Sequence, residues 1–187
     1  MMKSKTAIEE TGLTLFAFLR GINVGGKNII RMDELAEAFL SLGFTHVKTY
    51  IQSGNIRFQA YESNIASINE RIKIQLKRIF GYEGTVMLRT LEEMIFLLKS
   101  NPFREIVNDK KVKFYVSFLY EKPSNVPVLP LVSEKDGMEV FYICGKEAFI
   151  LSREVKGSYG FPNNFIEKVL GIPATTRNWN TIEKMPG

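Results

Sequence analysis

Apolar residues in the first half of the chain alternate with polar ones in three separate runs. These runs, typical of strands, are 13–20 (LTLFAFLR), 47–58 (VKTYIQSGNIRF) and 84–89 (GTVMLR). The middle run contains Ser53-Gly54, a pair that tolerates the positive φ of a hairpin turn, so we expect it to form two strands. The pattern therefore predicts four strands in this half.

Helical periodicity fills the gaps between these strands. The segment 31–43 is predicted to contain a helix with Asp33 as its N-cap. The next helix is predicted to have Ser63 or Asn64 as its N-cap. Gly43 and Gly81 are expected to end these two helices. Their apolar stripes are Leu35, Ala36, Phe39 and Leu40 in the first helix and Ile65, Ile68, Ile72, Leu76 and Ile79 in the second. The resulting order, β-α-β-β-α-β, is that of a split βαβ, or ferredoxin-like, unit.

A third helix is predicted directly after the last of these strands. Thr90 and Glu93 have the spacing of a capping box, in which each residue bonds the backbone N–H of the other. The helix is expected to stop before the segment Asn101-Pro102-Phe103.

The second half of the chain resembles a degenerate copy of the first. The run 114–119 (FYVSFL) matches the first strand, 139–151 (EVFYICGKEAFIL) matches the hairpin, and NNFIEKVLG matches the long helix in a shorter form. Ile51 corresponds to Ile143, and the sequence TLEEM to TIEKM. Three prolines in 121–137 predict that the first helix of this copy is shortened or lost.

These matches predict an α+β protein made of two tandem ferredoxin-like (α/β-plait) subdomains related by an internal duplication. The first subdomain, with its extra helix, is expected at 13–108, and the second, degenerate one at 109–187. Residues 1–12 lack the apolar core of a secretory signal, so we expect them to be a frayed leader.

Composition narrows the functional classes only slightly. The chain has 187 residues, and its 45% hydrophobic and 24% charged content is ordinary for a globular protein. No apolar run has the length of a membrane span. The only cysteine, Cys144, permits no intrachain disulfide, which favours a reducing, cytoplasmic location. A net charge of +5 weakly favours an anionic partner.

Candidate chemistry begins with the glycine-rich stretch RGINVGGKN. Gly21, Gly26 and Lys27 have the G-x-x-x-x-G-K spacing of a P-loop, but Asn28 stands where the Mg²⁺-binding Ser or Thr belongs. The next helix also begins too late for its N–H groups to face a phosphate, and a dinucleotide-binding G-x-G-x-x-G is not present. The sequence therefore argues against a P-loop and against a dinucleotide fold.

Two interpretations of this glycine loop remain. Gly21, Gly25 and Gly26 could supply the unusual φ values of a structural turn. Alternatively, the stretch could form an anion nest, because cationic and amide side chains stand beside backbone N–H groups that are expected to be exposed. These side chains are Arg20, Asn23, Lys27 and Asn28.

A split βαβ unit covers one face of its sheet with helices and leaves the other face open. The alternation assigns to the covered face Leu15, Ala17, Leu19, Val47, Thr49, Ile51, Ile56, Phe58, Val86 and Leu88. The open face then holds Phe16, Phe18, Arg20, Lys48, Tyr50, Gln52, Asn55, Arg57, Met87 and Arg89. Such a mixture could stack bases and meet phosphates, although the RNP1 pattern is absent. The alternative is that this face packs against the second subdomain, with Phe16, Phe18 and Tyr50 as the interface core.

Two further segments carry polar clusters. The turn Gln52–Asn55 corresponds to Cys-Gly-Lys-Glu in the second copy, so its amide side chains are present in the first copy alone. A feature present in one of two copies favours a binding site over a requirement of the fold. The alternative is that Ser53 serves only to form the turn. The segment Arg177-Asn178-Trp179 contains the only tryptophan. Either Trp179 is a buried C-terminal anchor, or the segment faces the same cleft as the turn.

Residues suited to catalysis or metal binding are few. His46, the only histidine, has no Cys or Asp cluster beside it, so we predict no metal site. Lys146 could lower the pKa of the Cys144 thiol, but no histidine base is near in the sequence. No cofactor is predicted, and no catalytic residue is assigned.

Taken in order, RGINVGGKN, TYIQSGNIRF, NPF and ATTRNWNT resemble the motifs of a bacterial family catalogued as domain of unknown function 1697, from about Leu13 over nearly the whole chain. The resemblance implies two α/β-plait subdomains and no particular activity, because the family has no established one. The motif positions that it carries over are Arg20, Gly21, Asn23, Gly25, Gly26, Gln52, Ser53, Gly54, Asn55, Arg177, Asn178 and Trp179. With Lys27, they form the predicted ligand-binding set.

Three functions are consistent with these residues. The leading hypothesis is a binder of nucleic acid, or of a phosphorylated or other anionic ligand, through the glycine loop and the open basic-aromatic face. The second is an enzyme acting on a small anionic substrate in a cleft between the subdomains, held by Arg20, Asn23, Gln52, Asn55 and Arg177. The third is a protein-interaction module whose partner covers the open face. None of them involves a membrane, and the oligomeric state is not predicted.

Overall fold

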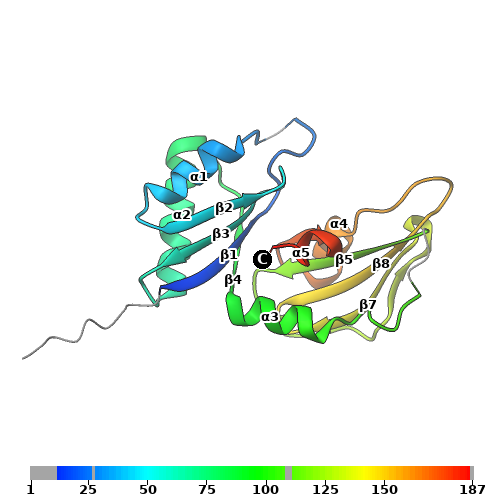
Figure 1. Cartoon of the computed structure of the whole chain (residues 1–187). Coiled ribbons are helices and arrows are strands. Elements are labelled where there is room, and N and C mark those ends of the chain that lie inside the picture. The colour runs from blue at the N-terminus through cyan, green and yellow to red at the C-terminus, as the bar shows by residue number, and fades with distance from the viewer. Residues whose placement is uncertain (1–11, 27, 108–110, 186–187) are drawn as a thin grey trace, which may run out of the picture.

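The computed structural model describes residues 12–26, 28–107 and 111–185. In the first half of the chain, four strands form an antiparallel sheet in the order β2-β3-β1-β4. They are β1 (Leu13–Leu19), β2 (Thr45–Tyr50), β3 (Asn55–Ala60) and β4 (Val86–Thr90). Figure 1 shows α1 (Met32–Leu40) and α2 (Ile65–Phe80) together on one face of this sheet. The predicted order of strands and helices is thus present.

The second half forms another antiparallel sheet, in the order β6-β7-β8-β5-β9. Its strands are β5 (Val112–Leu119), β6 (Leu131–Ser133), β7 (Met138–Cys144), β8 (Glu147–Arg153) and β9 (Ala174–Asn178). Three helices complete the fold: α3 (Leu91–Ser100) after β4, α4 (Asn163–Leu170) before β9 and α5 (Trp179–Ile182) after β9. The α+β class with two antiparallel sheets is therefore confirmed.

Most helix ends follow the predicted capping chemistry. The Asn64 side chain accepts a hydrogen bond from the Ser67 N–H, and Gly81 ends α2 in the left-handed conformation at φ 64°. Thr90 and Glu93 form both hydrogen bonds of the predicted capping box. These local signals were sufficient because each bond joins residues within one turn of the helix.

Three predictions about the helices need correction. In α1, Leu40 of the predicted stripe is exposed, and Ala38 is buried beside Leu35 and Phe39. Arg31, not Asp33, is the N-cap of α1, and the Asp33 carboxylate instead pairs with the Arg31 guanidinium at 2.6 Å. In α2, the predicted stripe is buried only in its middle, at Ile68, Ile72 and Leu76, whereas Ile65 and Ile79 at its two ends are exposed.

The second half lacks a counterpart of α1, as predicted. Between β5 and β7, a stretch that the structure describes throughout, the chain forms β6 and a 3-10 turn at Glu134–Asp136 but no α-helix. Pro123, Pro127 and Pro130 remove backbone N–H groups that a helix would need in this stretch. None of the helices in the described ranges combines the length and the apolar character that a bilayer crossing requires.

The helix-covered face of the first sheet is confirmed, with Ile51 as an exception. Its buried residues pack against α1 and α2 and include Leu15, Ala17, Leu19, Ile56, Phe58, Val86 and Leu88. Ile51 follows the end of β2, and its backbone enters the hairpin turn with φ 49°, so its side chain leaves the sheet face and is exposed.

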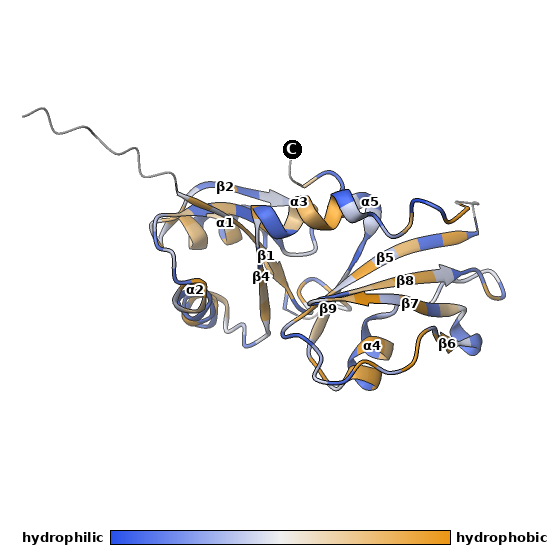
Figure 2. Ribbon diagram, turned by 90° about the horizontal axis from the view of Figure 1, so that it is seen from below, coloured by the Kyte–Doolittle hydropathy of each residue, from blue (hydrophilic) through white to orange (hydrophobic). Residues whose placement is uncertain are grey.

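The other face of the first sheet is closed by the second half. Phe16 and Phe18 are fully buried, and the Phe18 ring stacks on Phe118 with centroids 3.9 Å apart. Figure 2 shows α3 and α5 in the angle between the two sheets, where they add Met94 and Trp179 to the same cluster. The predicted open basic-aromatic face does not exist, and the alternative, packing against the second half, is confirmed.

This packing removes the surface on which base stacking depended. A base stacks only on an exposed ring, and Phe16 and Phe18 expose none. Tyr50 is half-buried against the same cluster, and Arg89 is buried. The third hypothesis required a separate protein to cover this face, but the second half of the same chain covers it.

Candidate functional site

A cleft of about 470 Å³ opens between the two halves beside the end of β1, a volume typical of small-molecule sites. The first half contributes the end of β1, the start of the glycine loop and the hairpin turn, and the second half contributes β9 and the amino end of α4. Five of the predicted site residues line this cleft: Arg20, Gly21, Ser53, Arg177 and Asn178. Three motifs far apart in the sequence therefore meet at one cleft, although Gln52 and Asn55, which were also expected there, do not line it.

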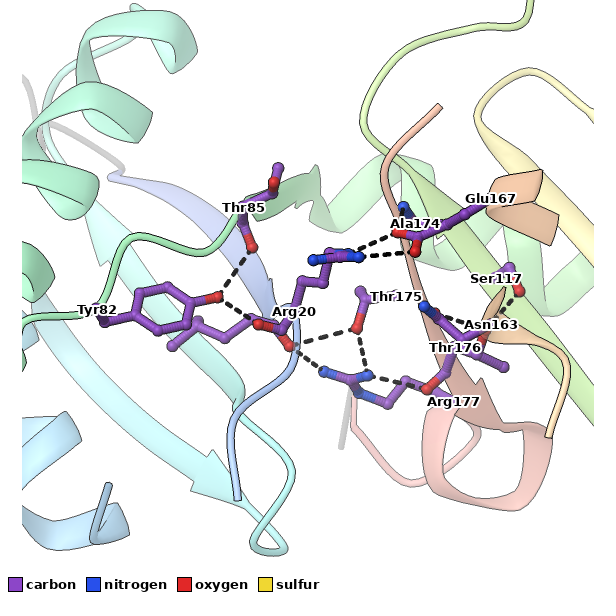
Figure 3. A network of polar contacts seen from close by, with 11 residues as sticks. Arg20, Tyr82, Thr85, Ser117, Asn163, Glu167, Ala174, Thr175, Thr176 and Arg177 are labelled. Atoms are coloured by element: carbon purple, nitrogen blue, oxygen red, sulfur yellow. Dashed lines mark hydrogen bonds and ion pairs between the residues drawn. The ribbon is translucent and has the colours of Figure 1, made fainter. Parts of the chain in front are cut away.

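Arg177 joins the two halves at one side of this cleft (Figure 3). Its five N–H groups donate to oxygen atoms of Leu19 (carbonyl, 2.8 Å), Ser53 (carbonyl, 2.7 Å), Asn55 (Oδ1), Thr175 (Oγ1, 2.7 Å) and Thr176 (carbonyl, 2.9 Å). Figure 3 draws the bonds to Thr175 and Thr176. Three of the five acceptor residues belong to the first half and two to β9. The guanidinium therefore has no donor left for a ligand and acts on the cleft through its charge.

The positive charge of Arg177 is buried at the edge of the cleft. Burial lowers the pKa of its guanidinium to about 10, which still leaves it protonated at neutral pH. The ion pairs formed among the described residues do not include Arg177. Dipolar oxygen atoms therefore solvate this charge, and no carboxylate of the described residues neutralises it.

Arg89 occupies the equivalent position in the first half. Arg89 on β4 pairs with Phe16 of β1, and Arg177 on β9 pairs with Val116 of β5. Phe16 and Val116 occupy matching positions, each three residues before the end of its strand. The Nη2 group of Arg89 donates to the carbonyls of Leu119 and Lys146 in the second half, at 2.9 Å each, just as Arg177 donates to carbonyls of the first half. Each arginine thus bonds backbone carbonyls of the opposite half, and we call this reciprocal pair of contacts the arginine clasp.

The two arginines differ in the residue that accepts from Nε. For Arg89, this acceptor is the Glu147 carboxylate at 2.5 Å. For Arg177, it is the neutral Oδ1 of Asn55, which lies at the same register of the hairpin as Glu147. Arg89 is therefore neutralised by an ion pair, whereas the arginine that lines the cleft is not.

Arg20 and Glu167 of α4 form an ion pair beside the cleft (Figure 3). Nε and Nη2 of Arg20 donate to the two carboxylate oxygens at 2.5 and 2.7 Å, and this bonding raises the pKa of Arg20. Burial by itself would raise the pKa of Glu167, but the hydrogen bonds from Arg20 and from the Ala174 N–H outweigh it and lower that pKa. Among the described residues, Nη1 of Arg20 makes no hydrogen bond, so Arg20 retains donors for a ligand.

The amide side chains of the glycine loop bind the backbone. Asn23 Oδ1 accepts from the Ile30 N–H at 2.8 Å, and its Nδ2 donates to the carbonyls of Ile30 and Gln52 at 3.0 Å each. The Asn28 Nδ2 donates to the Gly21 carbonyl at 3.0 Å. The structural-turn interpretation therefore accounts for both amides.

Several predicted site residues support the turn or the interface and do not line the cleft. A Cβ at Gly54 would lie 2.6 Å from the Ile22 side chain, so only glycine fits there. Trp179 is buried, and its Nε1 donates to Glu183 at 2.9 Å. The cleft lining also does not include Asn23, Gly25, Gly26, Gln52 or Asn55. Lys27 lies outside the described residues.

Some cleft residues were missed from the sequence. Thr175 and Thr176 precede Arg177 within the recognised motif, so that motif could have indicated them. Phe161 stands between Gly160 and Pro162 in a loop, where an apolar ring is hard to bury, and this was a usable signal. No local signal marked Glu167, because its partner lies 147 residues away.

His46 and Cys144, the two residues considered for catalysis, do not line the cleft. His46 is exposed on β2, and Cys144 is half-buried at the end of β7. Nowhere in the described ranges do three His, Cys, Asp or Glu side chains gather as they would around a metal ion.

Ile51 is a strained residue on the rim of this cleft. Its φ of 49° is the left-handed conformation, which is a genuine outlier for a β-branched residue. Such strain costs on the order of 1 kcal/mol or more and persists where the surrounding structure imposes it, often at functional sites. Here, the short turn between β2 and β3 imposes it.

We expect Ile51→Gly to raise the free energy of unfolding by about 1 kcal/mol, because glycine adopts this φ without strain. The measurement is chemical denaturation of the full chain. Ile74→Gly is the matched control: Ile74 is similarly exposed but lies within α2, where glycine should cost about 1 kcal/mol. Equal destabilisation by both substitutions would contradict the strain at Ile51.

Comparisons with known proteins give a family and a fold. A family model described as "Protein of unknown function (DUF1697)" matches residues 13–149, which is more than half of the chain but does not reach the motif around Arg177. A solved structure described as the conserved bacterial protein SP0830 from Streptococcus pneumoniae is similar over 93% of this chain and 97% of that chain, with 23% identity and a TM-score of 0.62. The curated proteins include no match. The likeness to the solved structure concerns the fold alone.

Proposed function

This chain belongs to the family of unknown function DUF1697, and from its cleft we propose that it binds a small anionic ligand between its two halves. The observation that carries this proposal is Arg177, a buried cation at the cleft that pairs with no carboxylate in the described part of the chain. A bound anion would supply the negative charge that Glu147 supplies to the equivalent Arg89. The proposal keeps the anionic ligand of the leading hypothesis and the location of the second.

Two further groups support an anion here. Within the ranges that the structure describes, the Nη1 group of Arg20 bonds no other residue, and 41% of the side chain is exposed. The amino end of α4, at Asn163 and Asn164, also lines the cleft. Its N-cap is Pro162, which provides no side-chain cap, so the first N–H groups of the helix are available to a negative charge.

We propose binding and assign no reaction. Among the described residues, the side chains that line the cleft include no His, Cys, Lys, Asp or Glu. The hydroxyl groups present, such as those of Ser53 and Thr181, have no base beside them in this lining. The cleft therefore offers groups that hold an anion and lacks an activated nucleophile.

We also propose that the two halves are ferredoxin-like copies from an internal duplication, divided at 13–108 and 109–187. The strand order β2-β3-β1-β4 recurs in the second sheet as β7-β8-β5-β9. The reciprocal contacts of Arg89 and Arg177 and the stacking of Phe18 on Phe118 support the same relation. In this view, the two copies differ at one matching position of the interface, which holds Asn55 in the first half and Glu147 in the second.

Calorimetric titration of the full chain with ribose 5-phosphate tests the anion site. We expect saturable binding that weakens with salt, and Arg20→Ala should weaken it at least tenfold, about 1.4 kcal/mol. Arg31→Ala is the matched control, because Arg31 also pairs with one carboxylate but does not line the cleft. It should leave the affinity within twofold.

A second variant tests the charge without removing a contact. Asn164→Asp adds a carboxylate to the cleft at the amino end of α4, where aspartate favours the helix. It should weaken ribose 5-phosphate binding, whereas Asn125→Asp, an exposed substitution of equal charge outside the cleft, should not. An affinity for ribose 5-phosphate that is unchanged in both Arg20→Ala and Asn164→Asp would refute the proposed site.

A further inference from the structure

Three strongly exposed apolar side chains line the cleft. Val24 and Ile51 from the first half and Phe161 from the second all line it, and they are 66%, 61% and 60% exposed. Apolar side chains left this exposed in a cleft are typical of a ligand site. The backbone strain at Ile51 is part of this arrangement, since the strained turn holds an isoleucine where glycine would be more stable.

Phe161 is held in place while much of its surface stays free. Its ring meets the Tyr115 ring edge to face, with centroids 5.9 Å apart and the planes at 90°. Tyr115 lies on β5 and lines the same cleft. A fixed aromatic ring with an exposed surface is a stacking platform for a flat ligand group.

Three amide side chains that line the same cleft can form hydrogen bonds with the edge of such a flat group. Asn163 and Asn178 use only their Oδ1 atoms, accepting from Thr176 Oγ1 and from the Asn180 N–H. In the described part of the chain, their Nδ2 groups and the whole amide of Asn164 make no hydrogen bond. An amide offers one donor and one acceptor side by side, which matches the edge of a nitrogen heterocycle.

We propose that the ligand of the cleft joins a planar nitrogen heterocycle to an anionic group, which is the chemistry of a mononucleotide. This rests on the anion site proposed above. The anionic group lies between Arg20 and the charge of Arg177, and the heterocycle stacks on Phe161 with the asparagine amides at its edge. The cleft volume, about 470 Å³, is that of a site for a molecule of this size.

Calorimetry with the full chain tests the heterocycle subsite. The probes are ribose 5-phosphate, the four ribonucleoside monophosphates and the four nucleosides. We expect at least one nucleoside monophosphate to bind at least tenfold more tightly than ribose 5-phosphate. Phe161→Ala should abolish this gain and leave the affinity for ribose 5-phosphate within twofold. Phe96→Ala is the matched control, because Phe96 is also exposed but lies on α3 and does not line the cleft.

The outcomes separate the two proposals. If every monophosphate binds no better than ribose 5-phosphate, or if Phe161→Ala preserves the gain, the heterocycle subsite is refuted and the anion site stands. If nucleosides bind but ribose 5-phosphate does not, the anion site is refuted, and with it a ligand that joins both groups. If no probe binds, both proposals are refuted.

Discussion

Arg177→Met should lower the free energy of unfolding by about 4 kcal/mol, among the largest effects expected for a single substitution in this chain. The change removes five hydrogen bonds from a buried group. The carbonyls of Leu19 and Ser53 would lose a partner, and an unsatisfied buried acceptor costs about 1–3 kcal/mol. For a chain of this size, the melting temperature should fall by about 10 °C.

The control for Arg177→Met is Arg153→Ala. Arg153 pairs with Glu139 at 2.6 Å, but its side chain is half-exposed, so its removal should cost less than about 1 kcal/mol. Arg177→Lys should recover only a small part of the loss, because one ammonium cannot reach five acceptors in different directions. Guanidinium denaturation measures all three variants. A melting temperature of Arg177→Met equal to that of the unsubstituted chain would show that the clasp contributes nothing to stability.

Phe18→Ala should destabilise the chain by about 4 kcal/mol, because it leaves a cavity at the centre of the interface between the two halves. The Phe18 ring is fully buried and lies parallel to Phe118, within 8°. On an open nucleic-acid face, the same substitution would have little effect on stability and a large effect on RNA binding. The expected result is the reverse, which makes this variant a direct test of the closed interface.

Phe161→Ala is the control for Phe18→Ala. Both substitutions remove one phenyl ring, but Phe161 is largely exposed, so the loss of its ring should cost less than about 1 kcal/mol. A double-mutant cycle between Phe18 and Phe118 should give a coupling of about 1 kcal/mol, since the two rings stack. Equal costs for Phe18→Ala and Phe161→Ala would contradict the closed interface.

The two halves differ in charge at matching positions of their interface. Each half contributes one arginine to the clasp, and only the acceptor at Nε differs, a carboxylate at Glu147 and an amide at Asn55. We therefore expect the functional difference between the halves to depend on electrostatics more than on shape. The anion titrations above measure this difference.

The sequence by itself determined the elements and the faces of the first sheet. The caps at Asn64 and Thr90 and the turn at Gly54 follow from hydrogen bonds and φ preferences that act within a few residues. Alternation also assigned Phe16 and Phe18 to the face opposite the helices. These features are local, so their signals survive in a single sequence.

Only the tertiary structure decided what covers that face and what Arg177 does. Its bond to the Leu19 carbonyl spans 158 positions, and no local pattern encodes such a pair. An arginine bonds carbonyl groups instead of a ligand when the packing of two distant segments buries it beside those carbonyls. The sequence therefore indicated that the motifs lie close together. Burial and long-range hydrogen bonding determined that most of their side chains build the interface and a few line the cleft.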